Sequence, residues 1–358
     1  MHVNIFNFLS FEVLSNHSHE GIYSHPNLPI WSWGLARSCC DIFPYDIGYY
    51  RRSYLEGGNS VDRNYFYRST VAGGSVIYIA AVDFPDFLIY FLSLSNDSKI
   101  ILVSGLEDIG APRELWNSPR EEFRNIWNDD LKIPTSMTGF IMDSRLRYWY
   151  VQNFDLVGCD TLSCSDVQQE TYHQFLQKVR PVPIGIDFHS LAGKNQVNSS
   201  MFAQSVIQQY NSLHTCRHIA SNSFDGRSKS ILVTFRCEFQ LHEEHYKITR
   251  KELCALIRKR IELDKIGGNV DASPLNIQSR YQMVRIIPPI PRSQLWSIMA
   301  QHAYCFAPPG HGIDTHRVWE ALLLGVMPIV ITSSMDALYS EFPVIIVDRW
   351  EDAFSFGK

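Results

Sequence analysis

The stretch CFAPPGHGIDTHRVWEAL, residues 305–322, decides the fold of this chain. Residues 303–306 are apolar and predict a short buried strand, which ends where Pro308, Pro309 and Gly310 follow. We expect Gly310 and Gly312 to adopt backbone angles that other residues resist. The pattern therefore predicts a strand that runs into a glycine-rich turn.

A helix is predicted directly after this turn. Either Asp314 or Thr315 is placed to cap it, and apolar residues recur at helical spacing from Val318 onward. Gly325 is expected to end the helix, and residues 328–331 predict the next buried strand.

A strand, a glycine-rich turn and a helix start together form an anion site, because free backbone N–H groups and the positive end of the helix dipole point at the same place. His316 and Arg317 lie in the first helical turn and offer donors to phosphate oxygens. Glu320 lies one turn further on and is suited to accept hydrogen bonds from ribose hydroxyls. The plainer interpretation is an ordinary connection between strand and helix, with a solvated His-Arg pair.

The pattern extends on both sides of the turn. Pro308-Pro-Gly-x-Gly-x-Asp-x-His-Arg-x-Trp-Glu-Ala-Leu322, followed by GVMPIV (325–330), LY (338–339) and FPV (342–344), resembles the signature of exostosin-type (GT47-type) glycosyltransferases. Upstream, RPVPIGIDFH (180–189) resembles the family's PIGLDFH segment, and WYVQN (149–153) resembles the segment before it. The match is dense from about residue 285 to 350, patchy from 140 to 190, and weak before that.

The resemblance implies a GT-B transferase, in which two Rossmann-type domains face a cleft. Its donor would be a nucleotide-sugar, UDP- or GDP-linked, and its acceptor a hydroxyl of a glycan or glycoconjugate, with inversion at the sugar. The donor would be held by residues of the turn and the helix: Pro309, Gly310, Gly312, Asp314, His316, Arg317 and Glu320.

Two other functions stay open. One is a truncated, catalytically inactive relative that binds nucleotide or glycan or acts as a scaffold. The other is a hydrolase that uses paired carboxylates and no nucleotide.

The composition suits a soluble two-domain enzyme. The chain has 358 residues and a net charge of −5 without a long basic run, which argues against nucleic acid and anionic membranes as partners. No transmembrane segment or signal peptide is predicted, because the apolar run 75–94 contains Asp83, Pro85 and Asp86. The resemblance implies a Golgi or secretory lumen, whereas the lack of a predicted anchor favours a cytosol-like compartment, and both stay open.

Eight cysteines give no zinc pattern, because no CxxC pair occurs. Cys159 and Cys164 flank a loop and are candidates for a disulfide in an oxidising lumen. We expect Cys254, on an apolar helix face, and Cys305, in an apolar strand, to be free thiols that pack as small hydrophobic groups.

Strands alternate with helices along the chain, which predicts doubly wound parallel sheets of the α/β class. The pattern divides into an N-terminal, acceptor-binding domain at 1–190 with an irregular cap, a linker at 191–229, and a C-terminal, nucleotide-sugar-binding domain at 230–358. Strands are predicted over 75–81, 99–103, 139–142, 182–186, 230–235 and 283–287, and helices over 84–94, 119–127, 202–214, 251–263 and 293–300, with a helix or turn over 145–152.

In open parallel sheets ligands collect beyond the carboxyl ends of the strands, which points to particular loops. In the second domain, Arg236 follows a predicted strand and is placed to neutralise a diphosphate, unless it is an ordinary surface arginine. Ser333 follows the strand at 328–331 and is placed to bind phosphate or ribose, unless it only caps the next helix.

In the first domain the same rule points to carboxylates that could take the proton of the acceptor hydroxyl. Glu107 and Asp108 are the first choice for this base, because two adjacent carboxylates raise the pKa of one of them. Asp83 is the second choice, because its simpler role is to cap the helix at 84–94. Asp187 and His189 are expected to organise the entrance to the seam between the domains.

The leaving diphosphate needs positive charge, which the GT-B type supplies with side chains and a helix dipole. The sequence has no Asp-x-Asp pair of the kind that metal-dependent sugar transferases use, since Asp129 and Asp130 are adjacent. We therefore expect no metal and no cofactor. The chain ends at Lys358, earlier than the family resemblance implies, so Trp350 and Phe354 are expected to have little to pack against.

Overall fold

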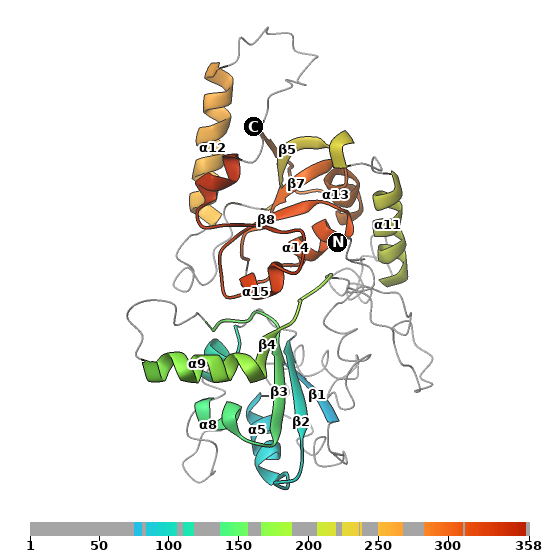
Figure 1. Cartoon of the computed structure of the whole chain (residues 1–358). Coiled ribbons are helices and arrows are strands. Elements are labelled where there is room, and N and C mark those ends of the chain that lie inside the picture. The colour runs from blue at the N-terminus through green and yellow to red at the C-terminus, as the bar shows by residue number, and fades with distance from the viewer. Residues whose placement is uncertain are drawn as a thin grey trace, which may run out of the picture. The chain divides into compact units, whose positions relative to one another are not determined.

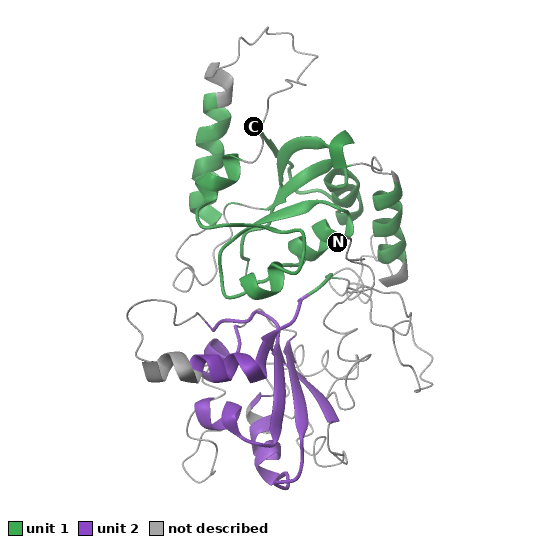
Figure 2. Cartoon of the chain, viewed as in Figure 1, with its two compact units in different colours: residues 1–12, 25–30, 185–358 green, residues 13–24, 31–184 purple. Residues whose placement is uncertain are grey.

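The computed structural model describes residues 75–80, 84–105, 110–117, 137–156, 166–187, 206–219, 224–235, 237, 250–267, 283–310 and 312–355 (Figure 1). They belong to two compact units, one of which ends at Ile184 while the other continues from Gly185 (Figure 2). Each unit is built on a parallel β-sheet. The α/β class with two parallel sheets is therefore confirmed, while the boundaries at residues 190 and 230 stay a prediction.

The first unit holds a four-stranded parallel sheet in the order β1-β2-β3-β4. Because each connection advances in the same direction, right-handed crossovers place its helices on one face. An aromatic core fills this face: Phe84, Phe87, Phe91, Phe140 and Trp149 are at most 1% exposed. The elements are β1 (Ser75–Ala80), α5 (Phe84–Ser93), β2 (Ile100–Gly105), α6 (Arg113–Asn117), α8 (Met137–Met142), β3 (Leu146–Val151), α9 (Asp166–Lys178) and β4 (Val179–Pro181).

Three predicted elements are wrong. Strand β4 spans Val179–Pro181, upstream of the strand predicted at 182–186. Residues 139–142 belong to helix α8 instead of a strand, and residues 146–151 form strand β3 instead of a helix or turn. Trp149 and Val151 share one face and are buried, whereas Tyr148 and Tyr150 lie on the other face and are only partly buried. Its sequence LRYWYV hides this alternation, because tyrosines occupy the less buried face. Helix α9 was not predicted, since its sequence is mostly polar.

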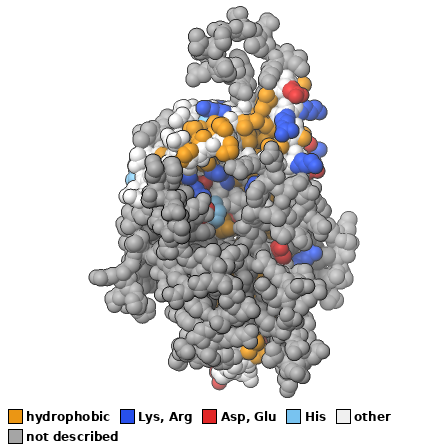
Figure 3. All heavy atoms as spheres, turned by 180° about the vertical axis from the view of Figure 1, so that it is seen from behind, with side chains coloured by type: hydrophobic (Ala, Val, Ile, Leu, Met, Phe, Trp, Pro, Cys, Tyr) orange, Lys and Arg blue, Asp and Glu red, His pale blue; other side chains and the backbone are white. Residues whose placement is uncertain are grey.

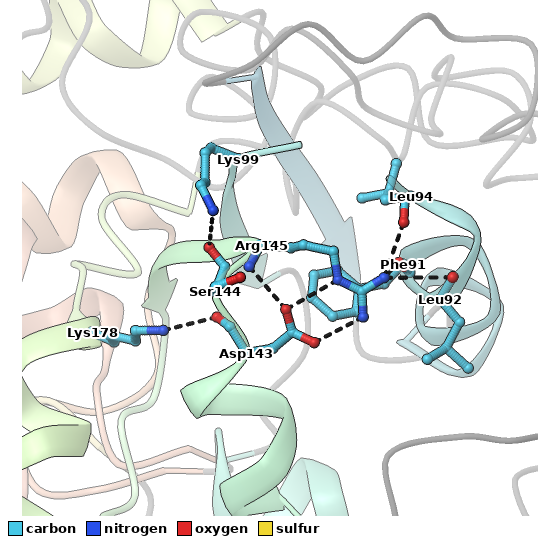
Figure 4. Close-up of polar contacts among 8 residues, drawn as sticks. All are labelled: Phe91, Leu92, Leu94, Lys99, Asp143, Ser144, Arg145 and Lys178. Carbon is cyan, nitrogen blue, oxygen red and sulfur yellow. Dashed lines mark hydrogen bonds and ion pairs between the residues drawn. The ribbon is translucent and has the colours of Figure 1, made fainter. Parts of the chain in front are cut away.

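Arg145 ties helix α5 to the start of β3 (Figure 4). Its guanidinium donates to the carbonyl oxygens of Phe91 at 3.0 Å and Leu94 at 3.1 Å, which end α5. The same group binds the carboxylate of Asp143 at 2.8 Å, and this hydrogen bond lowers the pKa of Asp143. The arginine thus satisfies helix-end carbonyls and compensates a carboxylate at once.

We expect Arg145→Met to lower the free energy of unfolding by about 2–3 kcal/mol, because several charge-assisted hydrogen bonds are lost together. Arg147→Met is the matched control, since Arg147 is exposed two residues further on and should change stability by less than about 0.5 kcal/mol. Urea unfolding of both variants measures the difference. Equal losses of unfolding free energy in the two variants would show that the contacts of Arg145 with the helix-end carbonyls and Asp143 do not stabilise the fold.

The second unit holds a five-stranded parallel sheet in the order β6-β5-β7-β8-β9. The connection from β5 to β6 runs in one direction and every later connection runs in the other, so right-handed crossovers place helices on both faces. The sheet is therefore doubly wound, and its strand order reverses between β5 and β7. The elements are α11 (Val206–Ile219), η2 (Phe224–Gly226), β5 (Ser228–Val233), α12 (Arg250–Gly267), β6 (Val284–Ile286), α13 (Arg292–Met299), β7 (His302–Phe306), α14 (His316–Leu323), β8 (Met327–Ile331), α15 (Asp336–Tyr339), β9 (Ile345–Val347) and η3 (Trp350–Ser355).

The short helix η3 covers the sheet beside α12. Trp350 is 1% exposed and belongs to one core cluster with Leu253 and Ile257 of α12. The ring centroids of Phe354 and Phe306 lie 5.8 Å apart. The expectation that Trp350 and Phe354 would have little to pack against is therefore wrong. On its outer face α12 exposes charged side chains, and Figure 3 shows Lys and Arg beside Asp and Glu on this part of the unit.

The end of α14 is fixed by backbone geometry and by two arginines. Gly325 has a φ of 71°, so it ends the helix as predicted. Arg227 donates to the carbonyl oxygens of Leu324 at 2.9 Å and Gly325 at 2.7 Å, and Arg217 of α11 donates to that of Leu323 at 3.2 Å. These cations complement the negative end of the helix dipole.

A disulfide joins Cys237, in the turn after β5, to Cys254 of α12. The expectation of a free thiol at Cys254 is therefore wrong. Its partner Cys237 lies in a turn, and the spacing of apolar residues predicts helices and strands but not the position of a turn. Cys305 is free and fully buried, as predicted, and burial raises the pKa of its thiol to about 12. Cys159 and Cys164 lie outside the described residues. In the part of the chain that is described, no helix is long and apolar enough to cross a membrane.

His302 begins β7 and is 0% exposed. Its Nδ1 donates to the carbonyl oxygen of Ile298 at 2.9 Å, and burial lowers the pKa of the ring below its usual 6.5. The unfolded chain therefore binds a proton on this ring near pH 6.5, whereas the folded chain binds it only at a lower pH. Stability from this group is present above pH 6.5 and is lost as the pH falls below that value.

We expect the wild type to lose up to about 1.4 kcal/mol of unfolding free energy per pH unit below 6.5 through this group. His302→Asn keeps a nitrogen donor near Nδ1 but cannot titrate, so its stability should fall less between pH 7.5 and 5.5. Urea titrations at both pH values test this. Identical losses in the two proteins would contradict the assignment.

Candidate functional site

The candidate site lies at the reversal of strand order between β5 and β7, where the carboxyl ends of the strands open a crevice in doubly wound sheets. The chain leaves β7 at Phe306, and residues 307–315 connect it to α14. The backbone N–H of Gly310 donates to the carbonyl oxygen of Gly312 at 3.0 Å, which closes the turn. The predicted strand, glycine turn and helix are therefore all present.

The reason for the glycine at position 310 differs from the expectation. Among the described glycines only Gly185 and Gly325 have positive φ, so the expected special angles at Gly310 and Gly312 are wrong. A Cβ at Gly310 would instead lie 2.9 Å from a guanidinium nitrogen of Arg250. A side chain at position 310 would therefore have to displace the Arg250 guanidinium from the turn.

Arg250 is the first residue of α12 and reaches the turn from another element. Its Nε donates to the carbonyl oxygen of Pro309 at 2.8 Å. Burial lowers the pKa of Arg250, and the nearby charge of Arg317 lowers it further. Within the described residues no carboxylate pairs with Arg250. Arg250 thus contacts the turn without a counter-ion among the described residues, and Arg317 is close enough for its charge to act on Arg250.

Arg317, Glu320 and Arg292 form a partly buried charged chain. Arg317 Nη1 binds Glu320 Oε2 at 2.7 Å, and Arg292 Nε lies 3.6 Å from Glu320 Oε1. Glu320 is only 2% exposed. Arg292 also binds Asp187 Oδ2 at 2.8 Å and donates to the carbonyl oxygen of Asp187. Although burial opposes its charge, Glu320 and Asp187 outweigh burial and raise the pKa of Arg292.

His316 connects α14 to the same upstream segment. Its Nδ1 lies 2.7 Å from the carbonyl oxygen of Gly185. Because a carbonyl oxygen only accepts, Nδ1 carries the proton in this contact. Gly185 and Asp187 belong to the segment 180–189 quoted above, so two segments that carry the family resemblance meet in space.

Asp314 lies inside the unit at 2% exposure. Trp319 Nε1 donates to its two carboxylate oxygens at 2.9 and 2.8 Å, and the Tyr339 hydroxyl donates to Oδ1 at 2.9 Å. Burial and the charge of Asp314 raise the pKa of Tyr339 well above its usual range. Thr315 is the N-cap residue and makes no side-chain cap bond, so the cap expected from Asp314 or Thr315 is wrong.

Ser333 follows β8 and takes part in the turn that leads to α15. Its backbone N–H donates to Asp336 Oδ1 at 2.9 Å, and its Oγ accepts from the N–H of Met335 at 3.2 Å. The arrangement matches the simpler interpretation, in which the serine serves the start of the next helix.

At the carboxyl edge of the other sheet, the structure describes one carboxylate that the sequence did not single out. Burial raises the pKa of Asp155 to about 6. Its oxygens accept the backbone N–H groups of Arg113 and Glu114, which begin α6. The geometry assigns Asp155 to capping this short helix.

Several predicted site residues lie outside the described residues, namely Asp83, Glu107, Asp108, His189 and Arg236, and their roles stay predictions. The sequence missed Arg250 and Arg292. Each is the first residue of its helix and belongs to no quoted motif, so the only signal was a basic residue where a helix begins. In the described ranges no three His, Cys, Asp or Glu side chains gather as a metal site would require.

No family model matches this chain, and no curated protein matches it. Solved structures give weak likenesses. An α,α-trehalose-phosphate synthase (UDP-forming) from Burkholderia vietnamiensis is 9% identical, with a TM-score of 0.35 over 87% of this chain and 72% of that chain. The synthase from Burkholderia multivorans is 10% identical, with a TM-score of 0.34 over 87% and 69%.

The catalytic domain of starch synthase IV from Arabidopsis thaliana, bound to ADP and acarbose, is 15% identical, with a TM-score of 0.31 over 73% of this chain and 57% of that chain. Identity and TM-score are too low in all three for the likeness to carry an argument about function.

Proposed function

We propose that this chain is a glycosyltransferase that moves a sugar from a nucleotide-sugar donor to a hydroxyl of a glycan or glycoconjugate. One observation carries the proposal: Arg250 contacts a glycine turn at the N-terminus of α14, where the strand order of a doubly wound sheet reverses, and Arg317 lies in the first turn of that helix. This arrangement suits a diphosphate. The family resemblance of the same residues indicates that this diphosphate belongs to a nucleotide-sugar.

The diphosphate would lie against residues 309–312 and the start of α14. The positive end of the helix dipole favours negative charge there. Two guanidinium groups that repel each other gain when an anion lies between them, and each can form charge-assisted hydrogen bonds with phosphate oxygens. Arg236 adds a third cation in this proposal.

Glu320 has two roles in this proposal. It holds the guanidinium of Arg317 in place across one helical turn, and it accepts hydrogen bonds from the ribose hydroxyls. Arg292 compensates the buried charge of Glu320. Asp187, bound to the other side of Arg292, holds that arginine in position.

The proposed reaction is a direct displacement with inversion. The acceptor oxygen attacks the anomeric carbon, the bond from that carbon to the diphosphate oxygen breaks, and the nucleoside diphosphate leaves with the electron pair. A carboxylate takes the hydroxyl proton, and Glu107, Asp108 and Asp83 remain the candidates. Arginine side chains and the helix dipole stabilise the leaving group, so we propose a reaction without metal or cofactor.

The test is release of nucleoside diphosphate from a panel of UDP- and GDP-sugars, with and without glycan acceptors and EDTA. We expect turnover with one donor class, insensitivity to EDTA, and a loss of about 100-fold or more in Glu107→Ala/Asp108→Ala. Asp97→Ala is the control, since Asp97 is an exposed carboxylate of the same unit.

Binding without turnover of any donor would favour the inactive, scaffolding relative. Turnover that survives in the double variant would exclude Glu107 and Asp108 as the base and leave Asp83. Sugar release that requires no nucleotide would support the hydrolase.

A further inference from the structure

Helix α11 carries two histidines, His214 and His218, four residues apart and therefore on one face. Both side chains are exposed, whereas Gln209 and Leu213 are 0% and 3% exposed on the opposite, packed face. Neither histidine belongs to the nucleotide site, and the proposed reaction uses neither of them.

The two rings face each other with the nitrogens at their tips. Nε2 of His218 lies 3.3 Å from Nε2 of His214, and the ring centroids are 4.3 Å apart. Two imidazole nitrogens bound to one tetrahedral ion at about 2.0–2.1 Å are about 3.3–3.4 Å apart. In square-planar or octahedral coordination the same bonds give about 2.8–3.0 Å. The observed distance fits the tetrahedral case.

We propose that His214 and His218 bind one divalent transition-metal ion of tetrahedral preference, Zn²⁺ or Co²⁺. Each histidine offers Nε2, and water completes the coordination. A pair of histidines at this helical spacing is a recognised zinc-binding element, because one helix face presents both ligands to one point. Among the described residues no third His, Cys, Asp or Glu completes a cluster, so the site has two protein ligands there.

The helix holds these ligands in position before the metal arrives. Helix α11 packs on α13. Arg217, which lies between the histidines in sequence, donates to the carbonyl oxygen of Leu323. Its guanidinium is thus engaged with the end of α14 and is not a ligand. Ligands on a regular, anchored element need little rearrangement to bind.

Two neutral imidazoles that share one N–H···N hydrogen bond would show a similar separation. The metal can take the place of this hydrogen bond, because the donor ring can carry its proton on Nδ1 instead and leave both Nε2 atoms free to bind the ion. A measurement of binding distinguishes the two explanations, since only a metal site takes up an ion.

The experiment is isothermal titration of the full, tag-free, EDTA-treated chain with ZnCl₂, together with the visible absorption of the Co²⁺-loaded protein. We expect one Zn²⁺ per chain at this site and a tetrahedral Co²⁺ spectrum. His214→Ala and His218→Ala should each weaken this binding at least about tenfold, since one of two protein ligands is lost. Far-UV circular dichroism checks that the exposed substitutions leave the helix intact, and His218→Gln provides a second variant that retains a polar side chain.

Two control variants locate the ion. His173→Ala removes an exposed histidine of α9. Cys216→Ser removes a free thiol that lies between His214 and His218 in the sequence. Both variants should bind Zn²⁺ as the wild type does. Unchanged binding in His214→Ala and His218→Ala would overturn the proposal, as would no uptake by the wild type. Zinc binding is measured without nucleotide, so this experiment can contradict the metal site without contradicting the proposed transferase activity, and the reverse also holds.

Discussion

Replacing Asp314 by alanine is expected to lower the free energy of unfolding by about 3–5 kcal/mol, the largest effect on stability that we predict. The substitution leaves the Trp319 indole N–H and the Tyr339 hydroxyl without their buried acceptor. Each unsatisfied buried donor costs about 1–3 kcal/mol, and the lost carboxylate also leaves a cavity. Urea unfolding followed by tryptophan fluorescence measures the loss.

Two further variants divide this effect. Tyr339→Phe removes one donor and keeps the carboxylate, so it should cost about 1–2 kcal/mol. Asp336→Ala removes an only partly buried carboxylate from the same unit and should cost less than Asp314→Ala. If Asp314→Ala unfolds like Asp336→Ala, the buried carboxylate does not organise α14 and α15.

Arg250→Met is expected to weaken binding of the preferred nucleoside diphosphate by about 100-fold, the largest effect on binding that we predict. Charge-assisted hydrogen bonds contribute about 1.5–3 kcal/mol each, and the side chain is already held at the turn by the Pro309 carbonyl. Binding of the nucleoside without phosphates should be unchanged, because the methionine removes only the cation.

Arg258→Met is the matched control, since Arg258 is exposed on the same helix. Equal affinities of wild type and Arg250→Met would remove this arginine from the site. Equal losses in Arg250→Met and Arg258→Met would point to a general charge effect instead of a specific contact.

Local patterns predicted the part of the site that is local in sequence. The strand before Pro308, the turn and helix α14 follow from apolar spacing and from glycine and proline, and Trp296 and Met299 of α13 are buried as their spacing implies. The order β6-β5-β7 could not be predicted, because strand order depends on which long connections cross the sheet.

Contacts between distant residues explain what the sequence missed. Arg292 and Asp187 are 105 residues apart, and His316 and Gly185 are 131 residues apart, so no local pattern joins them. The pairing of Cys237 with Cys254 was missed for a related reason, since cysteine spacing does not fix connectivity. Strand β3 was misassigned because its tyrosines make the less buried face look apolar.

The most direct test of the account is isothermal titration of the purified chain with UDP, GDP and ADP, the corresponding monophosphates, and inorganic phosphate, each with and without EDTA. We predict that one diphosphate binds at one site per chain, more tightly than its monophosphate and without a requirement for metal, and that Arg317→Met weakens this binding. Absence of binding to every diphosphate by a chain that unfolds cooperatively would contradict the nucleotide site, and with it the transferase.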